Sequence, residues 1–167
     1  NRDGVVAGYR FFGSSSLAPG NYSAPFDKGR TMTHEVGHFL GLRHIWGDGN
    51  CSADDFCADT PNAAAANGGC PTIDSCPGGG NDMVQNYMDY TNDSCMNIFT
   101  NDQKTRMVTV MNNSPRRSSL KTSTKDIAIA LFANDAEVII ENSCGAVEPT
   151  CANPNPPAPL KIISLYN

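Results

Sequence analysis

The chain has 167 residues, of which 40% are hydrophobic and 17% are charged, so it is long enough to bury the core of one domain. Its net charge of −5, without clustered Lys and Arg among aromatic residues, argues against nucleic acid as a partner. No apolar run is long enough to span a membrane. Since the chain starts at Asn1 without a signal peptide, we interpret it as a mature or excised piece of a longer precursor.

The first forty residues predict one strand and one helix. Residues 4–13 (GVVAGYRFFG) predict a short strand, because β-branched and aromatic residues are bounded by glycines. Residues 14–26 are rich in Ser, Pro and Gly and predict a loop. Residues 28–42 place apolar side chains at helical spacings and predict a helix.

The rest of the chain predicts a long loop, a second helix and a β-hairpin. Residues 46–85 form a long polar segment that needs disulfides or a bound metal to become ordered. Residues 100–113 predict a helix with a Thr or Asn cap, and the polar residues 114–125 predict a boundary. Residues 126–140 alternate as two strands joined by a turn, and 148–161 predict a Pro-rich linker.

All three histidines of the chain lie within eleven positions, at His34, His38 and His44. On a helix His34 and His38 lie about 40° apart on one face, so both imidazoles can reach one zinc ion. Glu35 lies beside the same site and is placed to take a proton from a water on the metal. His44 could not join this site if the helix continued, so we expect Gly41 to end the helix and turn the chain back.

Three imidazoles would leave the fourth zinc position open, which is typical of catalytic rather than structural zinc sites. The motif HEVGHFLGLRH resembles the extended zinc motif of the metzincin metallopeptidases. The segment NYMDYTNDSCM (86–96) resembles the methionine turn of that family, with Met88 as the turn methionine and Tyr90 two residues later. Together with DDFCADTP and GCPT, these motifs resemble the pappalysin/cytophagalysin group of secreted peptidases.

The resemblance implies an α+β, metzincin-like zinc metallopeptidase catalytic domain. It covers about residues 1–120, where we expect a catalytic domain that lacks N-terminal strands, because only 33 residues precede His34. We assign residues 121–167 to a short β-rich C-terminal segment, a hairpin and linker that start an accessory part. A secreted location also follows from the resemblance.

The function that this resemblance implies is a zinc-dependent endopeptidase acting on a protein or peptide substrate. Peptide bonds would be hydrolysed by a zinc-activated water, with Glu35 as general base. Tyr90 would donate a hydrogen bond to the oxyanion, and Met88 would pack beneath the histidines without binding metal. Two alternatives stay open: a zinc-binding fragment acting as a non-catalytic binding module, and a metal-dependent hydrolase of a non-peptide substrate.

The loop after the zinc motif also suggests calcium. Its aspartates are compatible with an ordinary solvated loop, but carboxylates and carbonyls are the ligands that calcium prefers. Because similar enzymes often bind calcium near the DTP sequence, we name Asp54, Asp59 and Thr60 as calcium ligands.

Seven cysteines in a loop-rich chain without paired Cys-x2-Cys motifs predict disulfides in an oxidising compartment, with one thiol left over. Four of them flank or interrupt the long loop, and four cysteines allow three pairings. The family resemblance favours Cys51–Cys76 and Cys70–Cys95. Cys144 and Cys151 are close enough to close a small loop, which leaves Cys57 free.

Overall fold

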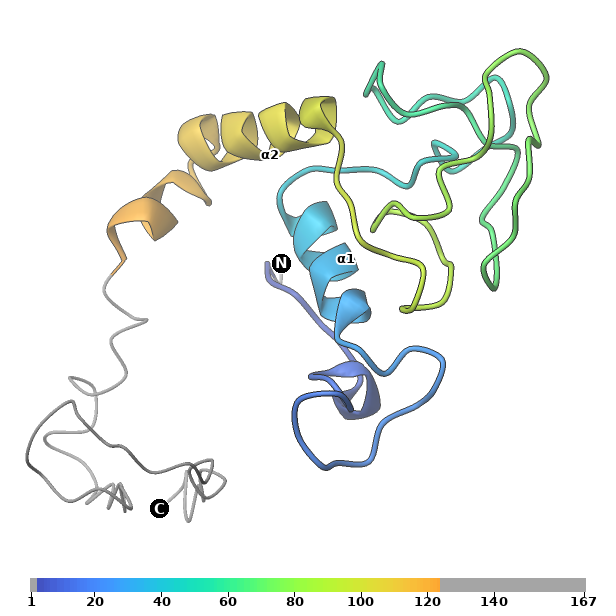
Figure 1. The fold of residues 1–167 in the computed structure, drawn as a ribbon. Helices are drawn as coiled ribbons and strands as arrows, with labels where there is room; N and C mark the ends of the chain where they lie inside the picture. Colours follow the sequence, from blue (N-terminus) through green and yellow to red (C-terminus); the bar gives the residue numbers. More distant parts are fainter. Residues whose placement is uncertain (1–2, 124–167) are drawn as a thin grey trace, which may run out of the picture. The chain divides into compact units, whose positions relative to one another are not determined.

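The computed structural model describes residues 3–123, and residues 3–122 belong to one compact unit (Figure 1). Two α-helices lie in this range, α1 (Arg30–Phe39) and α2 (Asn101–Asn113), together with two 3-10 helices, η1 (Tyr9–Phe11) and η2 (Ser118–Thr122). Neither α-helix of this part of the chain has the length and apolar character needed to cross a bilayer. The predicted hairpin, the Pro-rich linker and the Cys144–Cys151 pair lie outside the described residues.

The strand predicted for residues 4–13 is wrong. The structure places the 3-10 helix η1 there, closed by hydrogen bonds from the N–H of Phe11 to Gly8 O and of Phe12 to Tyr9 O. A strand needs a neighbour to satisfy its backbone groups, and none pairs with this segment within residues 3–123. The described part has only an isolated bridge between Asn86 and Ile98, so the β content of the predicted α+β class is not found there.

Helix α1 lies within the region predicted from the apolar spacing, and a residue from far along the chain caps its start. The N-cap residue, Gly29, has no side chain to accept a hydrogen bond. Asp93 Oδ2 instead accepts from the backbone N–H of Lys28 at 2.7 Å and of Arg30 at 3.2 Å. A carboxylate at this position also interacts favourably with the helix dipole.

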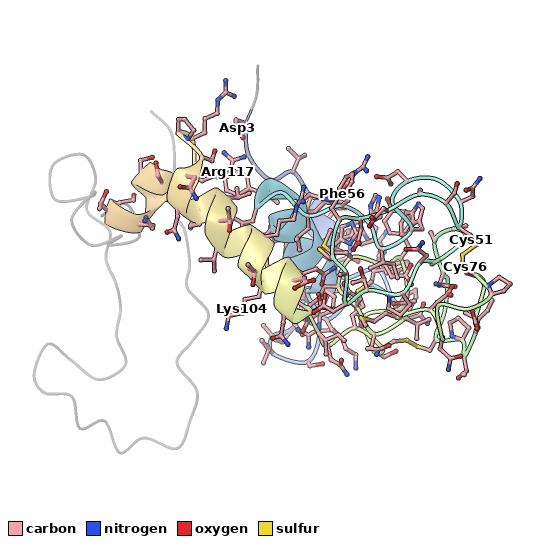
Figure 2. All side chains as sticks on the ribbon, turned by 90° about the horizontal axis from the view of Figure 1, so that it is seen from above. Asp3, Cys51, Phe56, Cys76, Lys104 and Arg117 are labelled. Carbon is pink, nitrogen blue, oxygen red and sulfur yellow. A yellow bond between two sulfur atoms is a disulfide. The ribbon has the colours of Figure 1, made fainter. Side chains whose placement is uncertain are left out.

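Helix α2 begins with Thr100 as its N-cap, one of the two cap types predicted. Thr100 accepts a hydrogen bond from the Gln103 backbone N–H, and the Gln103 side chain accepts from the Thr100 N–H, which forms a capping box. The helix contacts the end of α1, because Arg106 Nε donates to Gly41 O at 2.6 Å. Beyond α2, Arg117 stacks on the Phe39 ring and pairs with Asp3 (Figure 2).

Two disulfides tie the long irregular segment between the helices, as the sequence predicts for this loop. Cys51 pairs with Cys76 (Figure 2), and Cys70 pairs with Cys95, which is the interleaved arrangement that the family resemblance implied. On the chain-entropy model each bridge stabilises the fold by about 3–4 kcal/mol. Cys57 is buried and unpaired, and burial raises the pKa of its thiol to about 11. The thiol is therefore neutral and packed rather than reactive.

The hydrophobic core is small and lies around the turn that follows α1. It packs helix α1, the residues after it and the segment around Met88 against one another. Its buried members are Leu42, Ile45, Trp46, Ala63 and Met88, with the partly buried Met83, Phe99 and Met107 packed against them. The core thus includes Leu42, Ile45 and Trp46, the residues on either side of Arg43 and His44.

Candidate metal centre

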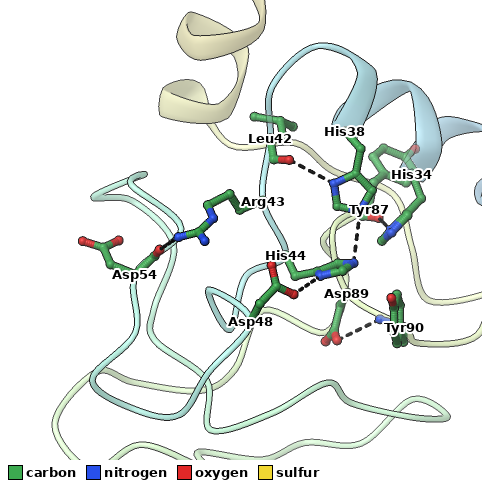
Figure 3. A network of polar contacts seen from close by, with 10 residues as sticks. All are labelled: His34, His38, Leu42, Arg43, His44, Asp48, Asp54, Tyr87, Asp89 and Tyr90. Carbon is green, nitrogen blue, oxygen red and sulfur yellow. Dashed lines mark hydrogen bonds and ion pairs between the residues drawn. The ribbon is translucent and has the colours of Figure 1, made fainter. Parts of the chain in front are cut away.

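The three histidines meet at one point of the structure. His34 and His38 project from the same face of α1, and His44 approaches from the segment after the helix (Figure 3). One ring nitrogen of each residue lies within 4.8 Å of the corresponding nitrogens of the other two. Within residues 3–123 this is the only cluster of three or more His, Cys, Asp or Glu side chains with metal-binding geometry.

The turn that brings His44 back depends on the end of α1. The N–H of Leu42 donates to Gly37 O at 3.0 Å and the N–H of Gly41 to His38 O at 2.9 Å, which is a Schellman motif. Gly41 has a φ of 87°, a left-handed conformation that favours glycine. The chain therefore leaves the helix axis at Gly41, as the sequence predicts, and His44 can face the other two rings.

Each histidine uses its Nδ1 atom to contact an oxygen away from the cluster. His34 Nδ1 lies 2.7 Å from Tyr87 O, and His38 Nδ1 lies 2.9 Å from Leu42 O. His44 Nδ1 contacts the Asp48 carboxylate. Because a carbonyl or carboxylate oxygen accepts from N–H, these partners assign the proton to Nδ1 in all three rings. The lone pairs of the three Nε2 atoms are then free to bind a metal.

The distances within the cluster fit a small cation. His38 Nε2 and His44 Nε2 lie 3.0 Å apart, and two lone pairs at that separation repel unless a proton or cation lies between them. Nitrogen ligands at 2.0–2.1 Å in a tetrahedral zinc site lie about 3.3–3.4 Å from one another. Burial lowers the pKa of His34 to about 4, so that imidazole is neutral, the form that binds metal. The donor set therefore fits zinc.

Met88 packs against helix α1 at Gly37, between the positions of His34 and His38 in the sequence. Its side chain is fully buried, and its backbone O accepts from the Ile45 N–H at 3.2 Å. A Cβ added at Gly37 would come within 2.5 Å of Met88 Sδ, so only glycine lets the methionine lie this close to α1. The buried Asn86 amide in turn accepts from the Met88 N–H and pairs with the Gln103 amide of α2.

Glu35 and Tyr90 line one pocket with His34. This pocket has a volume of about 240 Å³, and Arg30 and Asp93 also contribute to its wall. Tyr90 is 51% exposed, and its ring centroid lies 5.5 Å from that of His34. Burial of its hydroxyl, with the negative charge of Asp48 and Glu35, raises the pKa of Tyr90, so the phenol keeps its proton and remains a donor. An acid–base group and a hydrogen-bond donor therefore border the cluster.

The residues predicted to bind calcium have separate partners in the structure. Asp54 Oδ1 accepts from the Phe56 N–H, and Asp59 Oδ2 accepts from the Asp102 N–H at the start of α2. Thr60 is buried, and its hydroxyl contacts Asp55 Oδ1 and Cys57 O, each at 2.7 Å.

Asp55, which is not among the predicted calcium ligands, is a buried carboxylate of this loop. It is 3% exposed, and its Oδ2 atom has no hydrogen-bond partner in the described part of the chain. Burial raises the pKa of Asp55. A buried carboxylate oxygen without a partner is a position that a cation would stabilise.

Two further residues at the cluster were not predicted from the sequence. Asp48 contacts His44 Nδ1, and Trp46 stacks on the His44 ring with centroids 4.2 Å apart and an interplanar angle of 5°. Asp48 could have been predicted as a partner of His44, because it lies four residues later and ligating histidines usually donate their second N–H to an oxygen. No such signal indicates the stacking of Trp46.

A family model and several relatives match this chain. The model described as pregnancy-associated plasma protein-A, for the M43 peptidases, matches residues 4–112. Extracellular metalloprotease 1 of Coccidioides posadasii (strain C735) is 53% identical over 94 residues, 56% of this chain and 34% of the relative. An extracellular metalloprotease of Arthroderma otae is 50% identical over 95 residues, 56% of this chain and 35% of the relative.

A solved structure supports the same relationship. Mature mirolysin of Tannerella forsythia, in complex with a cleaved peptide, has a TM-score of 0.58 and 42% sequence identity. The match covers 72% of this chain and 45% of that chain, and it supports a metzincin-like catalytic domain. The present chain spans about a third of the length of the curated relatives it matches. By the match over residues 4–112, this chain belongs to the M43 peptidases, the pregnancy-associated plasma protein-A family.

Proposed function

We propose that the protein is a secreted zinc-dependent metalloendopeptidase. The main support for this proposal is that one ring nitrogen from each of the three histidines lies within 4.8 Å of the other two. Each Nδ1 atom contacts an oxygen, which leaves the Nε2 atoms for the metal. Family membership and relatives named extracellular metalloproteases support both the activity and the location. The mirolysin structure with a cleaved peptide supports a peptide as the substrate.

His34, His38 and His44 would hold the zinc ion, which when bound supplies Lewis-acid chemistry and makes a water molecule more acidic. Glu35 accepts the proton of the attacking water as general base and then delivers it to the leaving amine. Tyr90 donates its hydroxyl to the developing oxyanion. Met88 supports the histidines from below, and Gly41 sets the turn that delivers His44.

Chelator-sensitive cleavage of casein tests this proposal. The purified chain should cleave casein, lose the activity after treatment with a zinc chelator, and regain it when zinc is restored. A chain that binds zinc without cleaving casein or a peptide library would instead support the non-catalytic binding module. Activity that returns with added zinc but not with added magnesium would show that the chelator acts by removing zinc.

Tyr90→Phe should lower kcat by on the order of 10²–10³-fold while zinc content stays stoichiometric. The substitution keeps the ring that packs against His34 and His44 and removes only the hydroxyl. Steady-state kinetics on a fluorogenic peptide, with metal analysis of the same sample, measure both quantities. An unchanged kcat would assign Tyr90 to packing.

We also propose a calcium ion in the loop after the zinc motif. Asp55 Oδ2, Thr60 Oγ1 and Cys57 O provide a buried group of oxygens. The carboxylates of Asp54 and Asp59 do not already converge with that of Asp55, so they would move to bind the same ion. Because burial raises the pKa of Asp55, its ionisation destabilises the fold at neutral pH. Calcium would remove this penalty.

Calcium should therefore raise the Tm of the zinc-loaded protein at pH 7. At a calcium concentration 100 times the Kd the stabilisation is about 2.7 kcal/mol, and it should vanish at acid pH when Asp55 is protonated. Asp55→Asn should abolish the rise, whereas Asp74→Asn, at an exposed aspartate of the same loop, should keep it. Differential scanning calorimetry with magnesium as the comparison ion measures the effect. A full rise in Asp55→Asn would contradict this site.

A further inference from the structure

The third histidine is held differently from the other two. His34 and His38 belong to a helix, and their Nδ1 atoms contact backbone carbonyls. His44 lies outside the helix, and its Nδ1 contacts a side chain, the Asp48 carboxylate (Figure 3). Among the three rings, only His44 therefore has an outer partner that carries a negative charge and that a substitution can remove.

The backbone and the neighbouring ring restrict the same imidazole. Asp48 has a φ of 61°, a left-handed conformation in which Asp and Asn are the best-tolerated residues after glycine. Trp46, which is buried in the core, stacks flat on the His44 ring, and Tyr90 contacts that ring edge-on with centroids 4.9 Å apart. The plane of the ring is thus set by Trp46, while Asp48 fixes which nitrogen carries the proton.

Asp48 is not a member of the hydrophobic core. Its side chain is 51% exposed, and within residues 3–123 its side chain forms a hydrogen bond or close ion pair only with His44. Among the described residues, the buried groups that stabilise this turn are Leu42, Ile45 and Trp46. An exposed residue in a left-handed conformation whose side chain hydrogen-bonds to a metal-ligand candidate is more consistent with a role at the site than with a role in folding.

We propose that Asp48 is a positioning residue that orients His44 and strengthens its bond to zinc. By accepting the Nδ1 proton, the carboxylate fixes the tautomer in which Nε2 is the ligand and makes that nitrogen more basic. This role rests on the zinc site proposed above. It predicts that the charge and the oxygen of Asp48 contribute to metal affinity without touching the metal or the substrate.

Zinc competition with a chromophoric chelator tests this role in the whole chain. Asp48→Asn keeps an acceptor oxygen and the left-handed backbone but removes the charge, whereas Asp48→Gly keeps the backbone and removes both. We expect zinc affinity to fall about 10-fold in Asp48→Asn and about 100-fold in Asp48→Gly, the range typical of such outer partners. Asp74→Asn removes the same charge from an exposed loop position and should leave affinity unchanged.

The metal-free Tm separates positioning from a structural role. The positioning role predicts that both Asp48 variants keep the Tm of the metal-free protein and lose part of the zinc-induced rise. A role confined to the turn would lower the metal-free Tm and leave zinc affinity as it is. Zinc affinity within twofold of the parent in both variants would overturn the proposal. If the parent itself binds no zinc, the proposed function fails first, and the two failures are thereby distinguished.

Discussion

Glu35→Gln is expected to lower kcat/KM by on the order of 10²–10⁴-fold, while the protein retains one zinc per chain. The amide has nearly the same shape as the carboxylate but cannot accept the proton of the attacking water. Glu35 lines the pocket beside His34, so its loss removes the acid–base group without removing a ligand. Kinetics on a fluorogenic peptide, with elemental analysis of the same preparation, provide the measurement.

The control for Glu35→Gln is a variant that loses one negative charge at a position away from the site. Asp74→Asn, at an exposed position of the long loop, should keep parental activity. Glu35→Gln should also keep the parental Tm with zinc bound, because Glu35 is not part of the buried core. Turnover within twofold of the parent, at full zinc occupancy, would show that Glu35 is not the base.

His38→Ala is expected to lose zinc after dialysis and to reduce casein cleavage to the background rate. The His38 ring contacts both other rings, and its Nε2 atom lies 3.0 Å from that of His44. The two remaining imidazoles form an incomplete site, so zinc affinity should fall by more than the 10- to 100-fold expected for loss of an outer partner. Elemental analysis and chelator competition measure this loss.

A fold defect must be separated from ligand loss in this variant. The substitution also removes the contact of His38 Nδ1 with Leu42 O, which costs about 1 kcal/mol when a neutral hydrogen bond is lost. The metal-free variant should therefore have a Tm several degrees below that of the metal-free parent. Because the loss is small, its circular dichroism spectrum should match that of the metal-free parent. Stoichiometric zinc in folded His38→Ala would contradict the assignment of this ligand.

Local patterns predict the parts of the site that are close in sequence. His34 and His38 share a face because helical geometry fixes residues four apart, and Gly41 ends the helix because its backbone must turn left-handed. The Thr100 cap of α2 could likewise be predicted, since the cap and Gln103 are three residues apart. These features depend on neighbouring residues, which a single sequence displays directly.

Contacts between distant segments could not be predicted in this way. The carboxylate that caps α1 comes from Asp93, more than sixty positions later, and nothing in the sequence around Gly29 indicates it. The buried pairing of Asn86 with Gln103 joins the methionine turn to α2 across 17 positions. The strand expected for residues 4–13 failed for the related reason that strands depend on a partner, whereas residue composition describes only the segment itself.

X-ray absorption at the zinc edge of the purified parent protein tests the central claim most directly, because it reports the number and type of the atoms that bind the metal. The account predicts one zinc per chain, with three imidazole nitrogens and one oxygen at about 2.0–2.1 Å and no sulfur. The absence of sulfur is informative because Cys57 is a free cysteine that could bind zinc if the metal were held elsewhere. A sulfur shell at about 2.3 Å, fewer than three imidazoles, or no stoichiometric zinc would contradict it.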